Sequence, residues 1–202
     1  MKQYLFIGAL GGLAILGLPG FASPSSTGEG YLDGTVGDTC LLEPLAYGGS
    51  NNASLAAGAT SSAATIDFTD MVDPATALFK LNNVNITLTV SGYCNYVHSI
   101  SLQTSTSKFA AQDTGNLPTI TSDSFTTEID YNAVFVWADV TSTFLNTQGQ
   151  SGVTTSNPGT IAGAYRGTGM LSINLANPND VNAPLVAGSW SDTLTMQIGA
   201  AL

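Results

Sequence analysis

The stretch PLVAGSWSDTLTMQIG, residues 184–199, alternates between two kinds of side chain and decides the fold class. One set of alternate positions holds large apolar residues: Val186, Trp190, Leu194, Met196 and Ile198. The other set holds hydroxyl and amide residues: Ser189, Ser191, Thr193, Thr195 and Gln197. Successive side chains of a β-strand point to opposite faces, so the pattern predicts a single strand with one apolar and one polar face.

Other stretches repeat this period of two. Residues 81–90 and 94–102 each alternate, and the Ser91-Gly92 pair between them predicts a hairpin. Residues 128–140 place five apolar side chains on one face: Ile129, Tyr131, Ala133, Phe135 and Trp137. Residues 170–175 alternate through Leu171, Ile173 and Leu175, whereas the run 148–163, rich in Gly, Ser, Thr, Asn and Pro, is expected to be a loop.

The composition agrees with an all-β fold. The 202 residues include 25 Thr, 20 Ser, 14 Asn and 22 Gly, and only 9% are charged. Thr favours strands and Gly and Asn favour turns, while the helix formers Glu, Lys, Arg and Gln are scarce. The sequence therefore predicts one β-domain that is long enough to bury a core.

The charge balance argues against binding to nucleic acid or to an anionic membrane surface. Four basic residues face 14 acidic ones, for a net charge of −10. The four basic residues are scattered along the chain: Lys2, Lys80, Lys108 and Arg166. Phosphate recognition needs clustered Lys and Arg, so direct binding to DNA or RNA is not expected.

Residues 1–22 have the features of a cleaved export signal. Lys2 precedes a 14-residue apolar run from Leu5 to Leu18, and Gly20 and Ala22 form a small-x-small cleavage site. The run is shorter than the ~20 residues needed to span a bilayer, so we expect cleavage and no stable membrane span afterwards. The protein is then expected in the periplasm, at the cell surface or outside the cell, with residues 23–39 as a flexible leader.

The two cysteines, Cys40 and Cys94, are predicted to form a disulfide. An exported chain meets an oxidising compartment, where paired thiols are oxidised. The alternative is a metal site that includes His98, but two cysteines and one histidine without close spacing make a poor one. No metal or other cofactor is predicted.

Residues 187–196, AGSWSDTLTM, resemble the terminal A-G-x-Tyr-x-Asp-x-hydrophobic-x-hydrophobic strand of secreted spore coat protein U domain proteins. Those proteins are similar to the subunits of archaic chaperone–usher pili. The cysteine pair, one in an early strand and one at the end of a central strand, also matches the family. In this sequence Trp190 replaces the usual Tyr, and residues 199–202 extend past the expected end.

The resemblance implies that residues 40–202 form one immunoglobulin-like, pilin-like β-sandwich that lacks its final strand. A periplasmic chaperone and usher, and then like subunits, would be its partners, because a strand from outside fills the open groove. One wall of this acceptor groove would carry Trp190, Leu194, Met196 and Ile198. The leader would be the donor segment through Leu32 and Val36, but its few apolar residues predict a weak donor. A closed core that needs no donor is the alternative.

An enzyme is not expected, and no catalytic residue is predicted. His98 is the only histidine, it lies in an alternating strand, and no Gly-x-Ser-x-Gly motif is present. Four carboxylates are available for glycoside hydrolysis, but their spacing does not demand it: Glu128, Asp130, Asp139 and Asp192.

Two binding functions remain as alternatives. Asp67, Asp70 and Asp73 offer oxygen ligands for calcium, but they lack the EF-hand order and have the features of a turn. A self-complete lectin or adhesin-like sandwich would bind carbohydrate on exposed aromatic residues: Tyr47, Tyr93, Tyr96 and Trp137.

Overall fold

A computed structural model describes residues 35–60, 63–80, 84–112, 125–138 and 141–199. The chain divides into two units, Met1–Val36 and Gly37–Leu202, and all the described strands belong to the second. Of the two donor residues expected in the leader, Leu32 lies outside the described residues and Val36 has an exposed side chain.

The larger sheet is antiparallel and has β5 (Val84–Cys94), β12 (Tyr165–Pro178) and β8 (Glu128–Trp137) at its centre. Two short strands follow the outer edge of β5: β1 (Cys40–Leu42) and β2 (Ala46–Asn51). The outer edge of β8 pairs with β9 (Thr141–Asn146) and β7 (Phe109–Ala111), and β7 in turn pairs with β13 (Trp190–Ser191).

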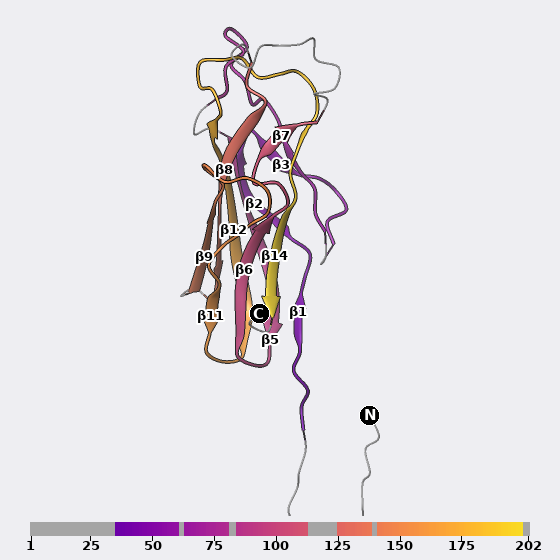
Figure 1. Ribbon diagram of the computed structural model, residues 1–202. Coiled ribbons are helices and arrows are strands. Elements are labelled where there is room, and N and C mark those ends of the chain that lie inside the picture. Colours follow the sequence, from indigo (N-terminus) through magenta and orange to yellow (C-terminus); the bar gives the residue numbers. More distant parts are fainter. Residues whose placement is uncertain (1–34, 61–62, 81–83, 113–124, 139–140, 200–202) are drawn as a thin grey trace, which may run out of the picture. The chain divides into compact units, whose positions relative to one another are not determined.

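The smaller sheet is built on β6 (His98–Thr104) (Figure 1). One edge of β6 pairs with β14 (Leu194–Gly199), and the other pairs with β10 (Thr154–Thr155) and β11 (Gly159–Ile161). A separate hairpin consists of β3 (Ala53–Leu55) and β4 (Ile66–Phe68). The described residues contain no helix, so the all-β prediction is confirmed for this part of the chain.

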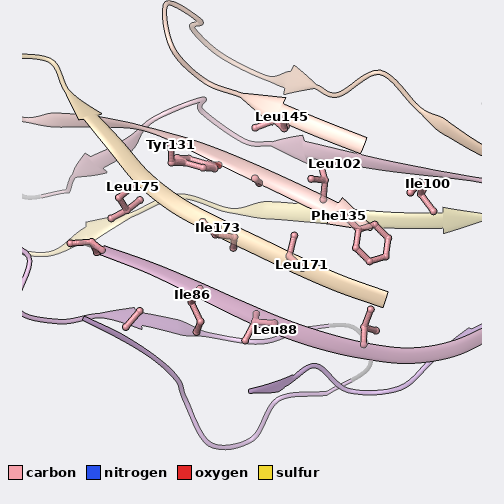
Figure 2. Close-up of a cluster of buried hydrophobic side chains, with 14 of the residues drawn as sticks. Ile86, Leu88, Ile100, Leu102, Tyr131, Phe135, Leu145, Leu171, Ile173 and Leu175 are labelled. Carbon is pink, nitrogen blue, oxygen red and sulfur yellow. The ribbon is translucent and has the colours of Figure 1, made fainter. Parts of the chain in front are cut away.

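The core lies between the curled sheets. Figure 2 shows Ile86 and Leu88 of β5 and Leu171, Ile173 and Leu175 of β12 gathered with Ile100 and Leu102 of β6. The five apolar side chains expected on one face of residues 128–140 are also buried there. Inward and outward residues alternate along β5 and β8, as the sequence predicts.

The predicted hairpin between residues 81–90 and 94–102 is wrong. Strands β5 and β6 overlap these stretches, but β5 pairs with β12 and with β1 and β2, whereas β6 belongs to the smaller sheet. Because both edges of β5 are occupied, the chain crosses to the other sheet after Cys94. Trp137 Nε1 donates to His98 Nε2 at 3.0 Å, and His98 Nδ1 is 2.8 Å from the Tyr96 carbonyl oxygen, so the buried imidazole fixes this crossing.

The run 148–163 is not only a loop, because β10 and β11 lie within it. These strands have two and three residues, too few for a visible alternation. Between them, buried Ser156 donates its N–H to the Leu102 carbonyl oxygen and accepts the Leu102 N–H on its Oγ, at 2.8 and 2.9 Å. The Ser156 hydroxyl oxygen therefore takes the place of a backbone carbonyl in the sheet hydrogen bonding. An alternation of apolar and polar residues does not reveal such a bond.

The predicted disulfide between Cys40 and Cys94 is present. The two residues face each other in the register of β1 and β5, and Cys94 is buried. Next to them, the Asn95 side chain accepts the Thr39 N–H and donates to the Gly37 carbonyl oxygen, at 2.7 and 2.9 Å. The disulfide therefore attaches the start of the β-domain to its central strand.

Candidate functional site

The C-terminal stretch is divided between the two sheets, so the prediction of one continuous strand is wrong. Trp190 belongs to β13, where it pairs with Ala111 of the larger sheet. Leu194, Met196 and Ile198 belong to β14, alternate with exposed residues and pack half-buried against the core. The four residues expected on one groove wall therefore come from two strands.

Asp192 lies between β13 and β14, and its hydrogen bonds hold the chain where it leaves the larger sheet for the smaller one. One of its carboxylate oxygens accepts the Ser105 hydroxyl at 2.7 Å, the Thr106 hydroxyl at 3.0 Å and the Thr193 N–H at 2.7 Å. The other oxygen accepts the Tyr131 hydroxyl at 2.7 Å. A carboxylate with this many donors is strongly held, so it fixes the chain where it passes from one sheet to the other. The sequence signal was an acidic residue on an otherwise apolar face.

The Tyr131 phenol is expected to make stability fall at alkaline pH. Burial, together with the hydrogen bond to Asp192, raises the pKa of Tyr131 well above its usual 10.0. The unfolded chain therefore loses this proton before the folded chain does, and stability that is fully present below pH 10.0 is lost as the pH rises further. Tyr131→Phe should reduce this fall by up to about 1.4 kcal/mol per pH unit. Urea unfolding of the unmodified protein and of Tyr131→Phe at about pH 8 and about pH 11 measures this difference. An equal loss of unfolding free energy in the two proteins would contradict the prediction.

One edge of β14 has no paired strand among the described residues. Ser105 N donates to the Thr193 carbonyl oxygen at 3.0 Å on the side of β6. Because bonding direction alternates along an antiparallel pair, the N–H and C=O groups of Leu194, Met196 and Ile198 point away from β6. In the described part of the chain, these outward backbone donors and acceptors pair with no other strand.

Two adjoining cavities lie along this edge, and we call them together the edge groove. The first, of about 270 Å³, is lined by Leu42 and Leu45, by Leu194 and Met196 of β14, and by residues at and just before the start of β4: Thr60, Ala63, Ala64 and Ile66. Its floor reaches the core at Val90, Leu171 and Ile173. Figure 1 shows β14, in yellow, between β6 and β1. β1 and β14 do not pair with each other, and the groove beside them reaches the core.

The second cavity, of about 410 Å³, continues the groove beside Trp190. It shares Ile173 and Leu194 with the first cavity and reaches Leu175 and Tyr131. Three aromatic residues pack together at its border. Phe68 of β4 meets Phe109 edge-on at 5.4 Å, and Phe109 stacks on Trp190 at 6.1 Å between ring centroids. Trp190 Nε1 also donates to the Val186 carbonyl oxygen at 3.1 Å, which fixes the indole.

The groove lining is acidic and apolar. Glu43 borders the first cavity, and Asp67 and Asp192 border the second, while none of the described residues that line either cavity is Lys or Arg. Glu43 and Asp67 are exposed, whereas Asp192 is engaged by its four neighbours.

Within the described residues, the carboxylates that the sequence offers for calcium binding or glycoside hydrolysis do not gather into a separate site. Asp70 pairs with Lys80 at 2.6 Å, and the Ala75 and Thr76 N–H groups lower the pKa of Asp73. In the described part of the chain no three His, Cys, Asp or Glu residues are placed to hold a metal ion. Asp130 pairs with Lys108, and Asp139 lies outside the described residues.

One of the four aromatic residues predicted to bind carbohydrate is buried. Trp137 is fully buried, so including it among the exposed sugar-binding residues is wrong. Tyr47 and Tyr93 are exposed. They lie on different strands, β2 and β5, and Tyr47 donates or accepts a hydrogen bond with Ser50 Oγ at 2.9 Å.

Comparisons of the chain with protein-family models, curated proteins and solved structures found no match. The resemblance of residues 187–196 to spore coat protein U domains therefore stays a prediction. Within the described residues, no helix is long and apolar enough to cross a membrane.

Proposed function

We propose that the protein is an exported structural subunit, of the pilus or coat type, that is completed by a β-strand from another polypeptide. The domain is then an immunoglobulin-like, pilin-like sandwich that lacks one strand. A chaperone first fills the edge groove, and a neighbouring subunit replaces it. The observation that carries this proposal is the free edge of β14 beside a groove that opens the apolar core.

Strand addition uses the two features that meet at this edge. Main-chain hydrogen bonds to the free edge supply affinity, and alternate side chains fill pockets. The backbone groups of Leu194, Met196 and Ile198 offer the hydrogen bonds, and the two cavities offer the pockets. An added strand would also cover apolar side chains that are now half-exposed, which is favourable in water.

A synthetic donor peptide is expected to stabilise the protein. The peptide has about nine residues, with Ile or Leu at every second position and Thr between them, and both ends are blocked. At a hundredfold excess over its Kd, it should raise the free energy of unfolding by about 2.7 kcal/mol. The melting temperature of the oxidised protein should then rise by about 5–10 °C in a thermal unfolding experiment.

Matched controls separate strand addition from general adhesion of an apolar peptide. Methyl groups on the peptide nitrogens of its apolar positions keep the side chains but remove donors, so the stabilisation should be lost. Met196→Glu places a charge in the groove and should abolish the effect, whereas Gln197→Glu, on the exposed side of β14, should keep it. A melting temperature that no peptide changes overturns the proposed function.

A further inference from the structure

We propose that the strand received by the edge groove comes from a different protein, and that it carries Lys or Arg beside its alternating apolar residues. The leader of a second copy of this chain is then the wrong donor. This inference rests on the proposed function, and it deepens that function by naming the chemistry of the partner.

The first argument is the charge of the groove. Glu43 and Asp67 lie exposed at the two cavities, and the described lining of both contains no basic residue. Complementary charge at the rim of an interface selects partners and increases their rate of association, while like charge excludes them. A strand with basic residues beside its apolar positions therefore fits this groove better than a neutral or acidic strand.

The second argument is the charge of the chain's own leader. Residues 23–39 contain Glu29, Asp33 and Asp38 and no Lys or Arg. A leader from a second copy would bring these acids towards Glu43 and Asp67. Two exported copies also repel each other, because without residues 1–22 each chain has 14 acidic residues and three basic ones.

The third argument is the size of the cavities. The floor formed by Val90, Leu171 and Ile173 and the neighbouring cavity beside Trp190 can each take a large side chain from one face of a strand. If the leader were an extended strand, Leu32 and Val36 would share one face with Gly34 between them. The position between the two apolar residues is therefore empty, and the leader fills the groove poorly.

Three peptides test the inference by titration calorimetry on the oxidised protein. The first is residues 23–39 of this chain, and the other two are the alternating donor peptide with Lys or with Glu at both ends. At about 20 mM salt the Lys-flanked peptide should bind about threefold to tenfold more tightly than the Glu-flanked one. At about 500 mM salt the difference should shrink, because exposed charges are screened. The leader peptide should bind most weakly.

The variant Glu43→Gln/Asp67→Asn should remove most of the preference for Lys while still binding both designed peptides. Equal affinities for the Lys and Glu peptides in the unmodified protein overturn the inference and leave the proposed function standing. A leader peptide that binds as tightly as the Lys-flanked one also overturns it, as do oligomers of oxidised protein that disappear when residues 23–39 are removed. If no peptide binds, the proposed function fails, and this inference fails with it.

Discussion

Trp137→Ala is expected to lower the free energy of unfolding by about 3–5 kcal/mol, because it removes the largest buried side chain of the core. The indole packs edge-on against Tyr165, with ring centroids 5.1 Å apart, and lies 6.1 Å from the Phe135 ring. A Cβ added to Gly169 would come within 2.6 Å of the indole, which shows how closely β12 approaches it. Little movement of the surroundings is available to fill the cavity that alanine leaves.

Two further variants separate packing from hydrogen bonding at this position. Trp137→Phe keeps a ring but removes the donor to His98, and a buried acceptor without a partner costs about 1–3 kcal/mol. Phe144→Ala is the matched control, since Phe144 lies exposed on β9 and should change stability by about 0.5 kcal/mol or less. Urea unfolding measures all three. A Trp137→Ala loss no greater than that of Phe144→Ala would contradict the described core.

The second large effect is expected from the disulfide. Cys40 and Cys94 are separated by 54 residues, and closing a loop of this length stabilises the folded state by about 4 kcal/mol in the chain-entropy model. The double variant Cys40→Ala/Cys94→Ala should unfold at a correspondingly lower urea concentration than the oxidised protein. The reduced unmodified protein is the control, because it keeps both sulfur atoms and should match the double variant closely. Equal stability of the oxidised and reduced proteins would contradict this prediction.

The sequence allows the strands and their buried faces to be predicted, but not which strands pair. The period of two identifies Val84, Ile86 and Leu88 as inward-facing whatever lies beside them, since it depends only on local backbone geometry. Pairing depends on which edges are already occupied. Both edges of β5 have partners from distant parts of the chain, so the adjacent stretch after Cys94 joins the other sheet.

The same difference between local alternation and strand pairing explains why only part of the candidate site is predictable from the sequence. Leu194, Met196 and Ile198 face the core as their alternation indicates. The place of Trp190 in the other sheet depends on Asp192, whose four partners come from residues 105–106, Tyr131 and Thr193. The sequence pattern indicates Asp67 only as an alternative calcium ligand and does not single out Glu43. Their common position at the groove exists only in the folded chain.

The disulfide also determines how the domain bears mechanical load. A pull on the chain ahead of Cys40 reaches β1, which has only three residues paired with β5 and by hydrogen bonds alone would peel away one residue at a time. The covalent bond to Cys94 instead transfers the force to the end of β5. That strand pairs with β12 along its whole length, so many more hydrogen bonds resist the force than the three residues of β1 could supply. Tension on the N-terminal side is thus carried by the centre of the larger sheet, and β1 stays in place beside the edge groove.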